Sequence, residues 1–195
     1  MIAISPLENI HKKGLFGDYQ DISKNKLINI SEAKDLQIIQ IVHYKKSTTR
    51  ISSLKLDNLY FPLTFMQVNS NNNTRILWNG PRNWLIVSTK KDILSTIKNI
   101  CDDKNFAITN LSHSRAVIEL KGSNAKEILK KGCPINLNEF KMNNCANSVF
   151  HGITITIDMI DNKPETFRIF SLRSFGESFY HSITDSCLEG GYEGR

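Results

Sequence analysis

One order of elements occurs twice along the 195 residues of this chain. Each copy is a run of strands followed by a helix, and the copies end at NWLIVSTKKDILSTI and TFRIFSLRSFGESFY. In both segments an apolar pattern typical of strands gives way to apolar positions with helical spacing. Strands and helices combined in this way favour an α+β fold. We predict two half-domains of ferredoxin-like type, at 36–105 and 106–189, packed as one unit.

The first copy begins with a β-rich apolar run and ends in an amphipathic helix. A hairpin is predicted around the sequence NGP, because Asn-Gly and Gly-Pro pairs are turn signals. The full set of elements expected here is strands at 36–44 and 61–68, a hairpin at 74–88, a short helix at 50–59 and a helix at 92–104.

The second copy is punctuated by glycine, proline and helix-capping residues. Ser123 is expected to cap one helix, which Gly132 and Pro134 then end. Ser174 and Glu177 form a capping-box pattern that predicts the start of the last helix. The predicted strands are 107–111, 114–121, a hairpin at 148–160 bent near Gly152, and 166–172.

The two ends of the chain lack this periodicity. Residues 1–35 are polar and weakly periodic, so we predict an extended arm outside the core. Residues 190–195, with the sequence GGYEGR, are predicted to form a flexible tail. A single domain over 36–189 is expected to lie between them.

Charge and cysteine content exclude several classes of protein. The net charge is +6, but the lysines occur as scattered pairs rather than one basic run, which disfavours nucleic-acid binding. The four cysteines include no C-x-x-C pair, so they suggest neither a zinc site nor a disulfide framework. There is no signal-peptide pattern and no apolar segment long enough to cross a membrane. We therefore expect a reduced, cytoplasmic protein without membrane contact.

The segment SHSR at 112–115 is the one candidate for chemistry. On a regular strand His113 and Arg115 would share a face, and Ser112 and Ser114 would point away from the histidine. A serine nucleophile needs its base within hydrogen-bond reach. Three interpretations stay open: catalysis, contact with a partner or ligand, and a polar cluster at the start of a strand.

Other combinations of residues point more weakly to function. Trp78 and Trp84 flank the predicted turn and either stack on a ligand ring or pack across the hairpin. Asp158 and Asp161 are the nearest carboxylate pair, with a solvated hairpin as the plainer interpretation. The five histidines show no metal-ligand spacing, and no phosphate-binding glycine loop occurs. The candidates for partner contact or a structural role are Trp78, Trp84, His113, Arg115 and Arg173. No catalytic, cofactor-binding or metal-binding residue is predicted.

Four segments resemble a known family, in order along most of the chain. They are SPL near the start, LWNGPRNWLIV at 77–87, NLSHSRAVIELKGSNAKEILKKGCPINL at 110–137, and TFRIFSLRSF at 166–175. Together they resemble the gamma subunit of heterotetrameric sarcosine oxidase. That resemblance implies a fold similar to the folate-binding N-terminal part of the aminomethyltransferase (T-protein) of glycine cleavage.

The resemblance also implies a function in a complex. Such enzymes demethylate sarcosine oxidatively to glycine, produce hydrogen peroxide and pass the one-carbon unit to tetrahydrofolate. FAD and FMN are expected on the beta subunit, NAD on the alpha subunit and zinc on the delta subunit, with no cofactor on this chain. We therefore expect a non-catalytic subunit that supports assembly with the alpha, beta and delta subunits.

Two alternatives remain. A stand-alone folate-binding, aminomethyltransferase-like protein is the first, although the further C-terminal β-domain of a T-protein is absent. The folate-handling aspartate of that family would fall within 153–160, where Thr156 lies nearest and Asp158 is offset, so it is not transferred to this chain. An RNA-binding module is the second alternative.

Overall fold

The structure, a computed structural model, describes residues 5–20, 23 and 26–195. Its backbone divides into two compact units. Unit 1 contains the chain up to Lys34 together with 114–142 and 147–195, and unit 2 contains 35–113 and 143–146. The predicted division at 105/106 differs, because the strand that follows the helix of the first copy stays in unit 2. The predicted α+β class is confirmed.

Unit 2 is built on a five-stranded antiparallel sheet with the order β6-β7-β8-β3-β9. Its strands are β3 (Gln37–His43), β6 (Val68–Ser70), β7 (Thr74–Gly80), β8 (Asn83–Ser88) and β9 (Phe106–Asn110). The predicted strand at 36–44 and the predicted hairpin are confirmed. The hairpin turn contains a register shift between Trp78 and Gly80, and Gly80 has a φ of +154° that favours glycine.

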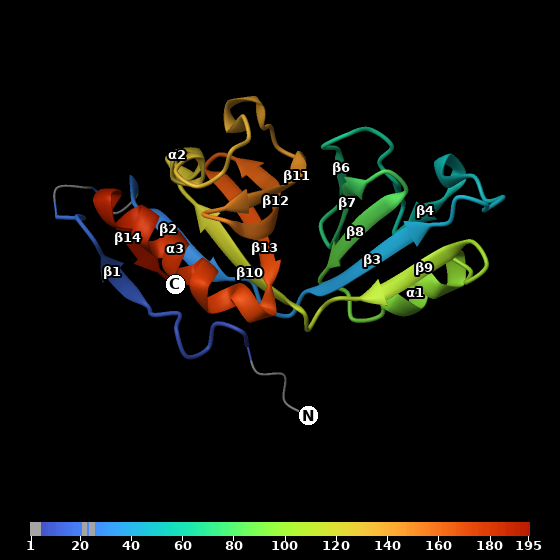
Figure 1. The fold of residues 1–195 in the computed structure, drawn as a ribbon, viewed down its shortest axis with the longest axis horizontal. Helices are drawn as coiled ribbons and strands as arrows, with labels where there is room; N and C mark the ends of the chain where they lie inside the picture. The colour runs from blue at the N-terminus through green and yellow to red at the C-terminus, as the bar shows by residue number, and fades with distance from the viewer. Residues whose placement is uncertain (1–4, 21–22, 24–25) are drawn as a thin grey trace. The chain divides into compact units, whose positions relative to one another are not determined.

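Helix α1 (Ile93–Ile100) covers one face of this sheet and is shorter than the predicted helix at 92–104. It packs against β3 and β4 (Lys55–Leu56), and in Figure 1 it is seen behind β9. The core beneath it is aliphatic with a few aromatic rings, and its fully buried members include Ile39, Ile41, Ile76, Ile86, Ile93, Ile97 and Phe106.

Two predictions for the segment between β3 and β6 are wrong. The expected helix at 50–59 is a 3-10 turn, η2 (Ile51–Ser53), followed by the short hairpin of β4 and β5 (Leu59–Tyr60). Asp57 and Asn58 take positive φ angles of 52° and 65°, which turn the chain tightly and prevent a helix. The expected strand at 61–68 begins only at Val68, because Pro62 cannot donate a ladder hydrogen bond.

Unit 1 is built on a seven-stranded sheet with the order β1-β14-β2-β10-β13-β12-β11. The strands are β1 (Gly14–Phe16), β2 (Ile28–Glu32), β10 (Arg115–Lys121), β11 (Cys145–Phe150), β12 (Ile153–Asn162), β13 (Glu165–Leu172) and β14 (Tyr192–Gly194). The hairpin bent at Gly152, with a φ of +83°, and the strand predicted at 166–172 are both present.

The chain ends belong to this sheet, which differs from the predicted arm and tail. Strand β14 runs antiparallel to β1 and parallel to β2, so the last strand lies beside the first two (Figure 1). Leu7 is fully buried, and Ser5 donates a hydrogen bond to the Glu32 carboxylate. Tyr192 is buried against Phe16, with ring centroids 5.1 Å apart. Residues 1–4, 21–22 and 24–25 of the predicted arm lie outside the described residues.

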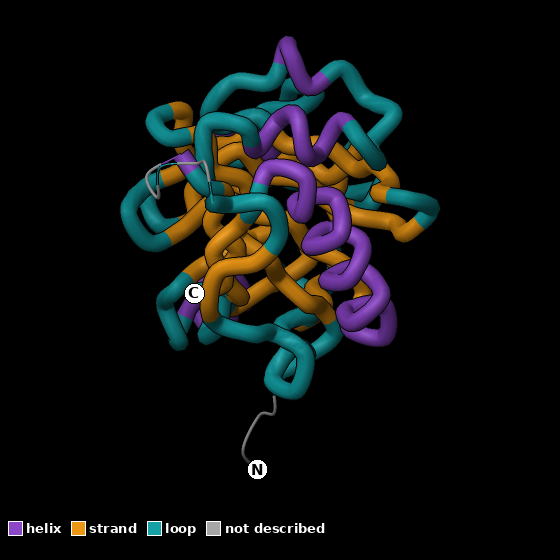
Figure 2. Tube along the Cα trace, turned by 90° about the vertical axis from the view of Figure 1, so that its left-hand side faces the viewer, coloured by secondary structure: helices purple, strands orange, loops and turns teal. Residues whose placement is uncertain are grey.

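Two helices pack on the unit 1 sheet. Helix α3 (Gly176–Cys187) contacts β10 and β13, and α2 (Ala125–Lys130) contacts β13 and α3; Figure 2 shows both against the strands. The predicted capping residues are not used. The N-cap of α3 is Phe175 after a 3-10 turn, η4 (Arg173–Phe175), and that of α2 is Asn124, neither with a side-chain capping bond. Among the described residues, no helix is long and apolar enough to cross a membrane.

The two sheets share one strand order, which is the structural form of the sequence repeat. In unit 2 it reads β6-β7-β8-β3-β9, and in unit 1 it reads β11-β12-β13-β10-β2. In unit 2 the last strand of this order is β9, which follows helix α1 in the sequence and pairs with β3. In unit 1 the corresponding strand is β2, which comes from the start of the chain and pairs with β10. The N-terminal segment is therefore a component of the second copy's sheet.

Candidate interaction sites

Residues 112–114 form a turn between β9 and β10, so only Ser114 departs from the predicted strand at 114–121, and no regular strand runs through His113. The Ser112 hydroxyl donates to the Asn110 side-chain oxygen at 2.7 Å and accepts the backbone N–H of Ile38 at 3.0 Å. These bonds use the hydroxyl to hold the turn. His113 is exposed and belongs to unit 2, while Arg115 begins a strand of unit 1. The shared strand face expected for this pair does not form.

Arg115 is a half-buried cation for which the described residues provide no ionic partner. Burial lowers the pKa of its guanidinium. Its Nη1 atom donates to the carbonyl and hydroxyl oxygens of Ser114, both at 3.3 Å. No carboxylate pairs with it in the part of the chain that the structure describes. A desolvated charge of this kind is costly until a counter-charge reaches it.

Exposed apolar side chains lie beside this arginine. Leu172 is the cross-strand partner of Arg115, so their side chains share one face of the sheet. The next residue, Arg173, donates its backbone N–H to the Ser114 carbonyl at 2.9 Å. Leu172 and Phe175 are 41% and 49% exposed. We call these four residues, Arg115, Leu172, Arg173 and Phe175, the η4 surface. The structure thus brings together two of the predicted contact residues.

Trp78 and Trp84 are also brought together, as cross-strand partners in the β7–β8 hairpin. Trp84 is buried, and its indole N–H donates to the Pro62 carbonyl at 2.7 Å. Its ring meets Phe61 edge to face at 5.3 Å. Trp78 is half-buried and packs edge to face with Phe65 at 5.4 Å. Trp84 is thus a core residue, whereas Trp78 reaches the surface.

A pocket of about 560 Å³ opens beside this pair, entirely within unit 2. We call it the hairpin pocket. Its apolar wall is formed by both tryptophans, Ile51 and Leu63, and its polar wall by Arg50, Arg82 and His43. The Arg82 guanidinium donates to the Tyr44 carbonyl at 2.8 Å, which holds it at the rim. No carboxylate lines the pocket.

His43 forms an unusual part of that wall. It is only 8% exposed, and its Nε2 atom has no hydrogen-bond partner among the described residues. Burial lowers the pKa of the imidazole, and the positive charge of Arg82 lowers it further; a hydrogen bond to the Thr49 backbone acts in the opposite direction. An unsatisfied buried nitrogen costs about 1–3 kcal/mol. The neutral histidine is therefore a source of instability at this wall.

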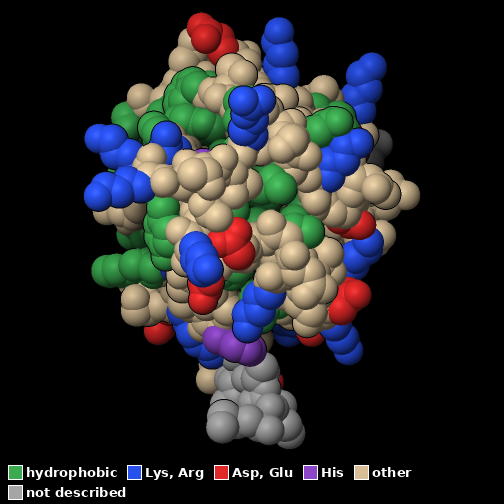
Figure 3. Space-filling model, turned by 90° about the vertical axis from the view of Figure 1, so that its right-hand side faces the viewer, with side chains coloured by type: hydrophobic (Ala, Val, Ile, Leu, Met, Phe, Trp, Pro, Cys, Tyr) green, Lys and Arg blue, Asp and Glu red, His purple; other side chains and the backbone are tan. Residues whose placement is uncertain are grey.

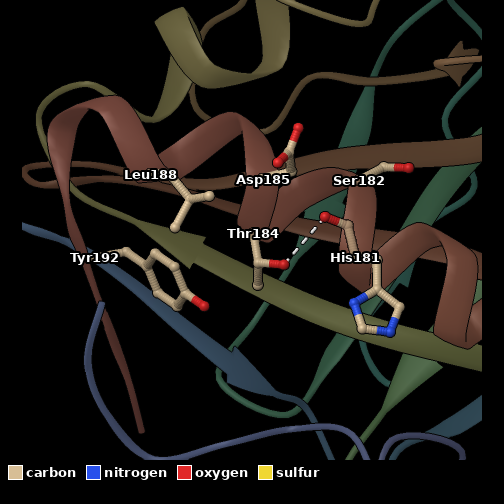
Figure 4. A pocket seen from close by; sticks show the side chains of 6 residues that line it. All are labelled: His181, Ser182, Thr184, Asp185, Leu188 and Tyr192. Carbon is tan, nitrogen blue, oxygen red and sulfur yellow. Dashed lines mark hydrogen bonds between the residues drawn. The ribbon is translucent and has the colours of Figure 1, made fainter. Parts of the chain in front are cut away.

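A second pocket, of about 470 Å³, lies on unit 1 between α3 and β14 (Figure 4). Its hydroxyl groups are turned back onto the helix. Thr184 donates to the His181 carbonyl at 3.0 Å, and Ser182 donates to the Ser178 carbonyl at 2.9 Å. His181 is exposed and lies 3.9 Å from Glu177. Both hydroxyls thus donate to helix carbonyls and not to the His181 ring, so the described residues form no serine–histidine or threonine–histidine pair here.

The carboxylate pair predicted on the 148–160 hairpin does not form a solvated site. Asp158 is fully buried within β12, opposite Arg168 in register, whereas Asp161 is exposed and accepts the backbone N–H groups of Asn162 and Lys163. The interpretation of both residues as a solvated hairpin is therefore wrong for Asp158. Thr156 lies two residues before Asp158 on the same strand, and its hydroxyl donates to the Asn147 side-chain oxygen at 2.7 Å.

The four cysteines are buried, free thiols. Burial raises the pKa of Cys101 and Cys187 to about 12 and that of Cys133 to about 11. The Cys145 thiol donates to the Trp78 carbonyl at 3.3 Å. Within the described ranges, no group of three His, Cys, Asp or Glu residues is placed to hold a metal ion.

Four surface residues were missed by sequence reasoning: Leu63 and Phe65 in unit 2, and Leu172 and Phe175 in unit 1. The predicted strands at 61–68 and 166–172 contain the first three of these residues, and the predicted last helix contains Phe175. For the first pair a signal was present, since Pro62 lies within the apolar run FPLTF, and a proline demotes such a run from a central strand. For Leu172 and Phe175 the sequence has no signal of exposure, because apolar residues at the end of a strand and in the following turn are found both buried and exposed.

Comparison with known proteins gives a consistent family. The family model described as "Sarcosine oxidase, gamma subunit family" matches residues 51–189. A curated relative, sarcosine oxidase subunit gamma of Corynebacterium sp. (strain U-96), is 27% identical over 119 residues. That match covers 60% of this chain and 57% of the relative, so the chain aligns with little more than half of the relative's length.

Two solved structures share the fold. A chain of the heterotetrameric sarcosine oxidase from Corynebacterium sp. U-96, in complex with pyrrole 2-carboxylate, superposes with a TM-score of 0.81 at 19% identity. The match covers 95% of this chain and 96% of that one. Glycine cleavage system aminomethyltransferase T from Bartonella henselae superposes with a TM-score of 0.58 at 11% identity, over 82% of this chain and 46% of the other.

Proposed function

The chain belongs to the sarcosine oxidase gamma subunit family, and from that premise we propose that it is a non-catalytic subunit of a heterotetrameric sarcosine-oxidising complex. Its role would be to support assembly in the cytoplasm, with no reaction centre of its own. The complex would convert sarcosine to glycine and hydrogen peroxide in connection with tetrahydrofolate. The proposal extends to partners of alpha, beta and delta type.

Cofactors would then reside on the partner subunits. In this proposal FAD and FMN belong to the beta subunit, NAD to the alpha subunit and zinc to the delta subunit. The residues of this chain agree with that division, since its thiols are buried with raised pKa values and its exposed histidines are scattered. Surface contact is what remains for this chain to contribute.

The observation that carries the proposal is the η4 surface. Arg115 is desolvated without an ionic partner among the described residues, and Leu172 and Phe175 stand exposed beside it. An arginine next to exposed apolar side chains is the composition of an interface centre, where arginine and aromatic residues dominate binding energy. A partner carboxylate at Arg115 would offset the cost of its burial.

Co-expression provides the direct test. The tagged chain is produced together with the genes that flank its own, purified through its tag, and assayed by mass, by visible flavin absorbance and by peroxide formation with sarcosine. We expect yellow partner proteins that oxidise sarcosine. A colourless chain that elutes alone under the same conditions would contradict the proposal.

Folate binding is the second candidate, favoured by the likeness to the aminomethyltransferase fold. In that case the isolated chain binds tetrahydrofolate saturably, and the half-buried Trp78 is a built-in reporter. Titration with tetrahydrofolate, followed by tryptophan fluorescence, separates the two candidates. Saturable quenching by the isolated chain supports folate binding, and a flat titration counts against it.

A further inference from the structure

We propose that the hairpin pocket receives a segment of a partner subunit in which a large apolar side chain stands next to a carboxylate. This inference rests on the proposed function as a subunit and adds a second contact region, in unit 2, with its own recognition chemistry. The apolar side chain would pack against Trp78 and Leu63, and the carboxylate would pair with Arg50 and Arg82.

The apolar part of the argument begins at the mouth of the pocket. Leu63 and Phe65 are 61% and 66% exposed on one short segment, and Phe65 packs against Trp78. Trp84 and Ile51 continue the same apolar surface inward. Large hydrophobic side chains gathered beside a pocket are typical of a binding surface, whereas scattered ones are ordinary. We therefore expect an apolar side chain to bind at this surface.

The charged part of the argument is the absence of acidic groups from the pocket wall. Arg50 is exposed, and neither Arg50 nor Arg82 forms an ion pair with any described residue. The Arg82 guanidinium donates to a backbone carbonyl. Lys45 and Lys46 are exposed immediately after Tyr44, the residue whose carbonyl holds Arg82. A carboxylate is the group that such a wall attracts, and arginine binds it in a two-pronged geometry.

The distribution of charge over the surrounding surface agrees with this. Figure 3, which views the side of β4, β9 and α1, shows lysine and arginine side chains spread over the face, with fewer Asp and Glu side chains and exposed hydrophobic side chains between them. The whole chain carries a net charge of +6. Such a field speeds the encounter with an acidic partner and opposes a second copy of this basic chain.

The shape of the surface favours a polypeptide over a small molecule. A pocket volume of about 560 Å³ lies in the ordinary range for small ligands, roughly 300–1,000 Å³. However, Phe65 extends the apolar surface beyond the residues that line the pocket. A small molecule inside the pocket leaves that ring in water. A chain segment that crosses the mouth covers Phe65 and fills the pocket together.

Cross-linking in the assembled complex tests the inference. The photo-reactive residue p-benzoylphenylalanine replaces Leu63 in the tagged chain, the complex is purified with its partner subunits, irradiated and digested. Mass spectrometry then identifies the captured peptide. We expect one partner segment with an Asp or Glu within two residues of a Leu, Met, Phe, Trp or Tyr. The same reagent in place of Asn99, exposed on α1, is the matched control and is expected to capture no such segment.

The outcomes separate this inference from the proposed function. If the complex assembles and oxidises sarcosine but position 63 captures no partner segment, the subunit role stands and the inference is overturned. Capture of a segment without an acidic residue, or of a second copy of this chain, also overturns it. If no complex forms even with the unsubstituted chain, the proposed function fails first.

Charge substitutions provide an independent measurement. Arg50→Glu is expected to weaken partner binding about tenfold or more, since a like charge then faces the carboxylate. Arg50→Lys is expected to bind within about threefold of the unsubstituted chain in low salt, because one positive charge is retained. Lys104→Glu, an equal charge change on an exposed residue of the same unit, is the control. Equal binding by the Arg50→Glu and Lys104→Glu variants would contradict the inference.

Discussion

At the scale of single residues, the chemical behaviour of several side chains depends more on their burial than on their residue type. His43, at the end of β3, lies with its ring 5.0 Å from that of Phe106 and is almost completely buried. In the sequence it is one of five scattered histidines with no distinguishing neighbours. Its environment makes it a titration site with a consequence for stability.

His43 is expected to make the fold less stable as the pH falls. Its pKa in the folded chain lies below the ordinary value of 6.5, chiefly because of burial. Between those two pKa values the unfolded chain binds a proton that the folded chain does not, so the free energy of unfolding decreases as the pH falls through about 6.5. Urea unfolding at a series of pH values from about 8 to about 5 measures this decrease.

The comparison with His43→Gln isolates the effect. Glutamine does not titrate, so the fall in unfolding free energy over the same pH range is expected to be smaller in the variant. The carboxylates with lowered pKa values, Asp57, Asp102 and Glu189, titrate below this range and contribute equally to both proteins. Parallel pH profiles would show that His43 is not the group responsible.

The thiols are expected to be inert in the folded protein. A thiol with a pKa of about 12, as for Cys101 and Cys187, is ionised on the order of one part in ten thousand at pH 8, and only the thiolate reacts. Ellman's reagent should therefore react slowly with native protein and rapidly with all four thiols in denaturant. Rapid reaction of a thiol before denaturant is added would be the contrary result.

At the scale of elements, the ends of the chain form strands that the sequence pattern did not predict. Strand β14 has three residues and β1 has three, which is too short for a period-two signal. Strand β2, with the sequence INISE, does alternate, since Ile28 and Ile30 are buried, but it lies in a polar stretch. Each strand is stabilised by the neighbour that it pairs with rather than by its own composition.

Replacement of a glycine in β14 tests whether the C-terminal end is ordered. A Cβ atom at Gly194 would lie 2.0 Å from the Lys12 carbonyl oxygen, a backbone atom that cannot move aside cheaply. Gly194→Ala is therefore expected to lower the free energy of unfolding by about 1–3 kcal/mol. Urea unfolding monitored by circular dichroism provides the measurement.

Gly190→Ala is the matched control, because no atom lies within 4 Å of the Cβ position there. It is expected to change the free energy of unfolding by less than about 0.5 kcal/mol. A flexible tail would make both substitutions equally harmless. Equal stability of the two variants would therefore favour the tail predicted from the sequence over the strand.

At the scale of the whole molecule, two surfaces dominate the functional interpretation. The η4 surface belongs to unit 1 and the hairpin pocket to unit 2. Each combines exposed apolar side chains with arginine and has no acidic residue within it. A subunit that contacts partners through both units would present such a pair of surfaces.

Truncation of the η4 surface is expected to weaken assembly without loss of folding. Arg115→Ala and Phe175→Ala should each reduce recovery of partner subunits about tenfold, a typical cost of about 1–2 kcal/mol or more for an interface arginine or aromatic residue. The melting temperature of the isolated Arg115→Ala chain should be unchanged or slightly raised, because a desolvated charge is removed. Tag pull-down and thermal unfolding measure the two effects.

Lys121→Ala is the control for these variants, since Lys121 is an exposed cation at the other end of β10. Its pull-down and melting temperature are expected to match those of the unsubstituted chain. Normal assembly and normal turnover by the Arg115→Ala complex would rule out the contact role of the η4 surface.

Long periodic segments could be recognised from the sequence alone. The β7–β8 hairpin, helix α1, strand β10 and the β12–β13 region follow their apolar patterns closely, because burial of one face selects one period. The repeat of strands and helix, and with it the α+β class, follows from the same patterns. Partner contact by Arg115 and Arg173 stays a prediction, and their closeness could not be predicted, because it depends on the pairing of β10 with β13.

Only the tertiary structure decided what the short and aperiodic segments do. One neighbour of β10 is the second copy's β13, but the other is the N-terminal β2, because pairing between distant segments depends on which edge is open and not on local sequence. The same non-local effect buries Asp158 and His43 and leaves Leu63, Phe65 and Phe175 exposed. Sequence periodicity determines which residues can share a face, but burial is decided by the neighbours that the folded chain brings to that face.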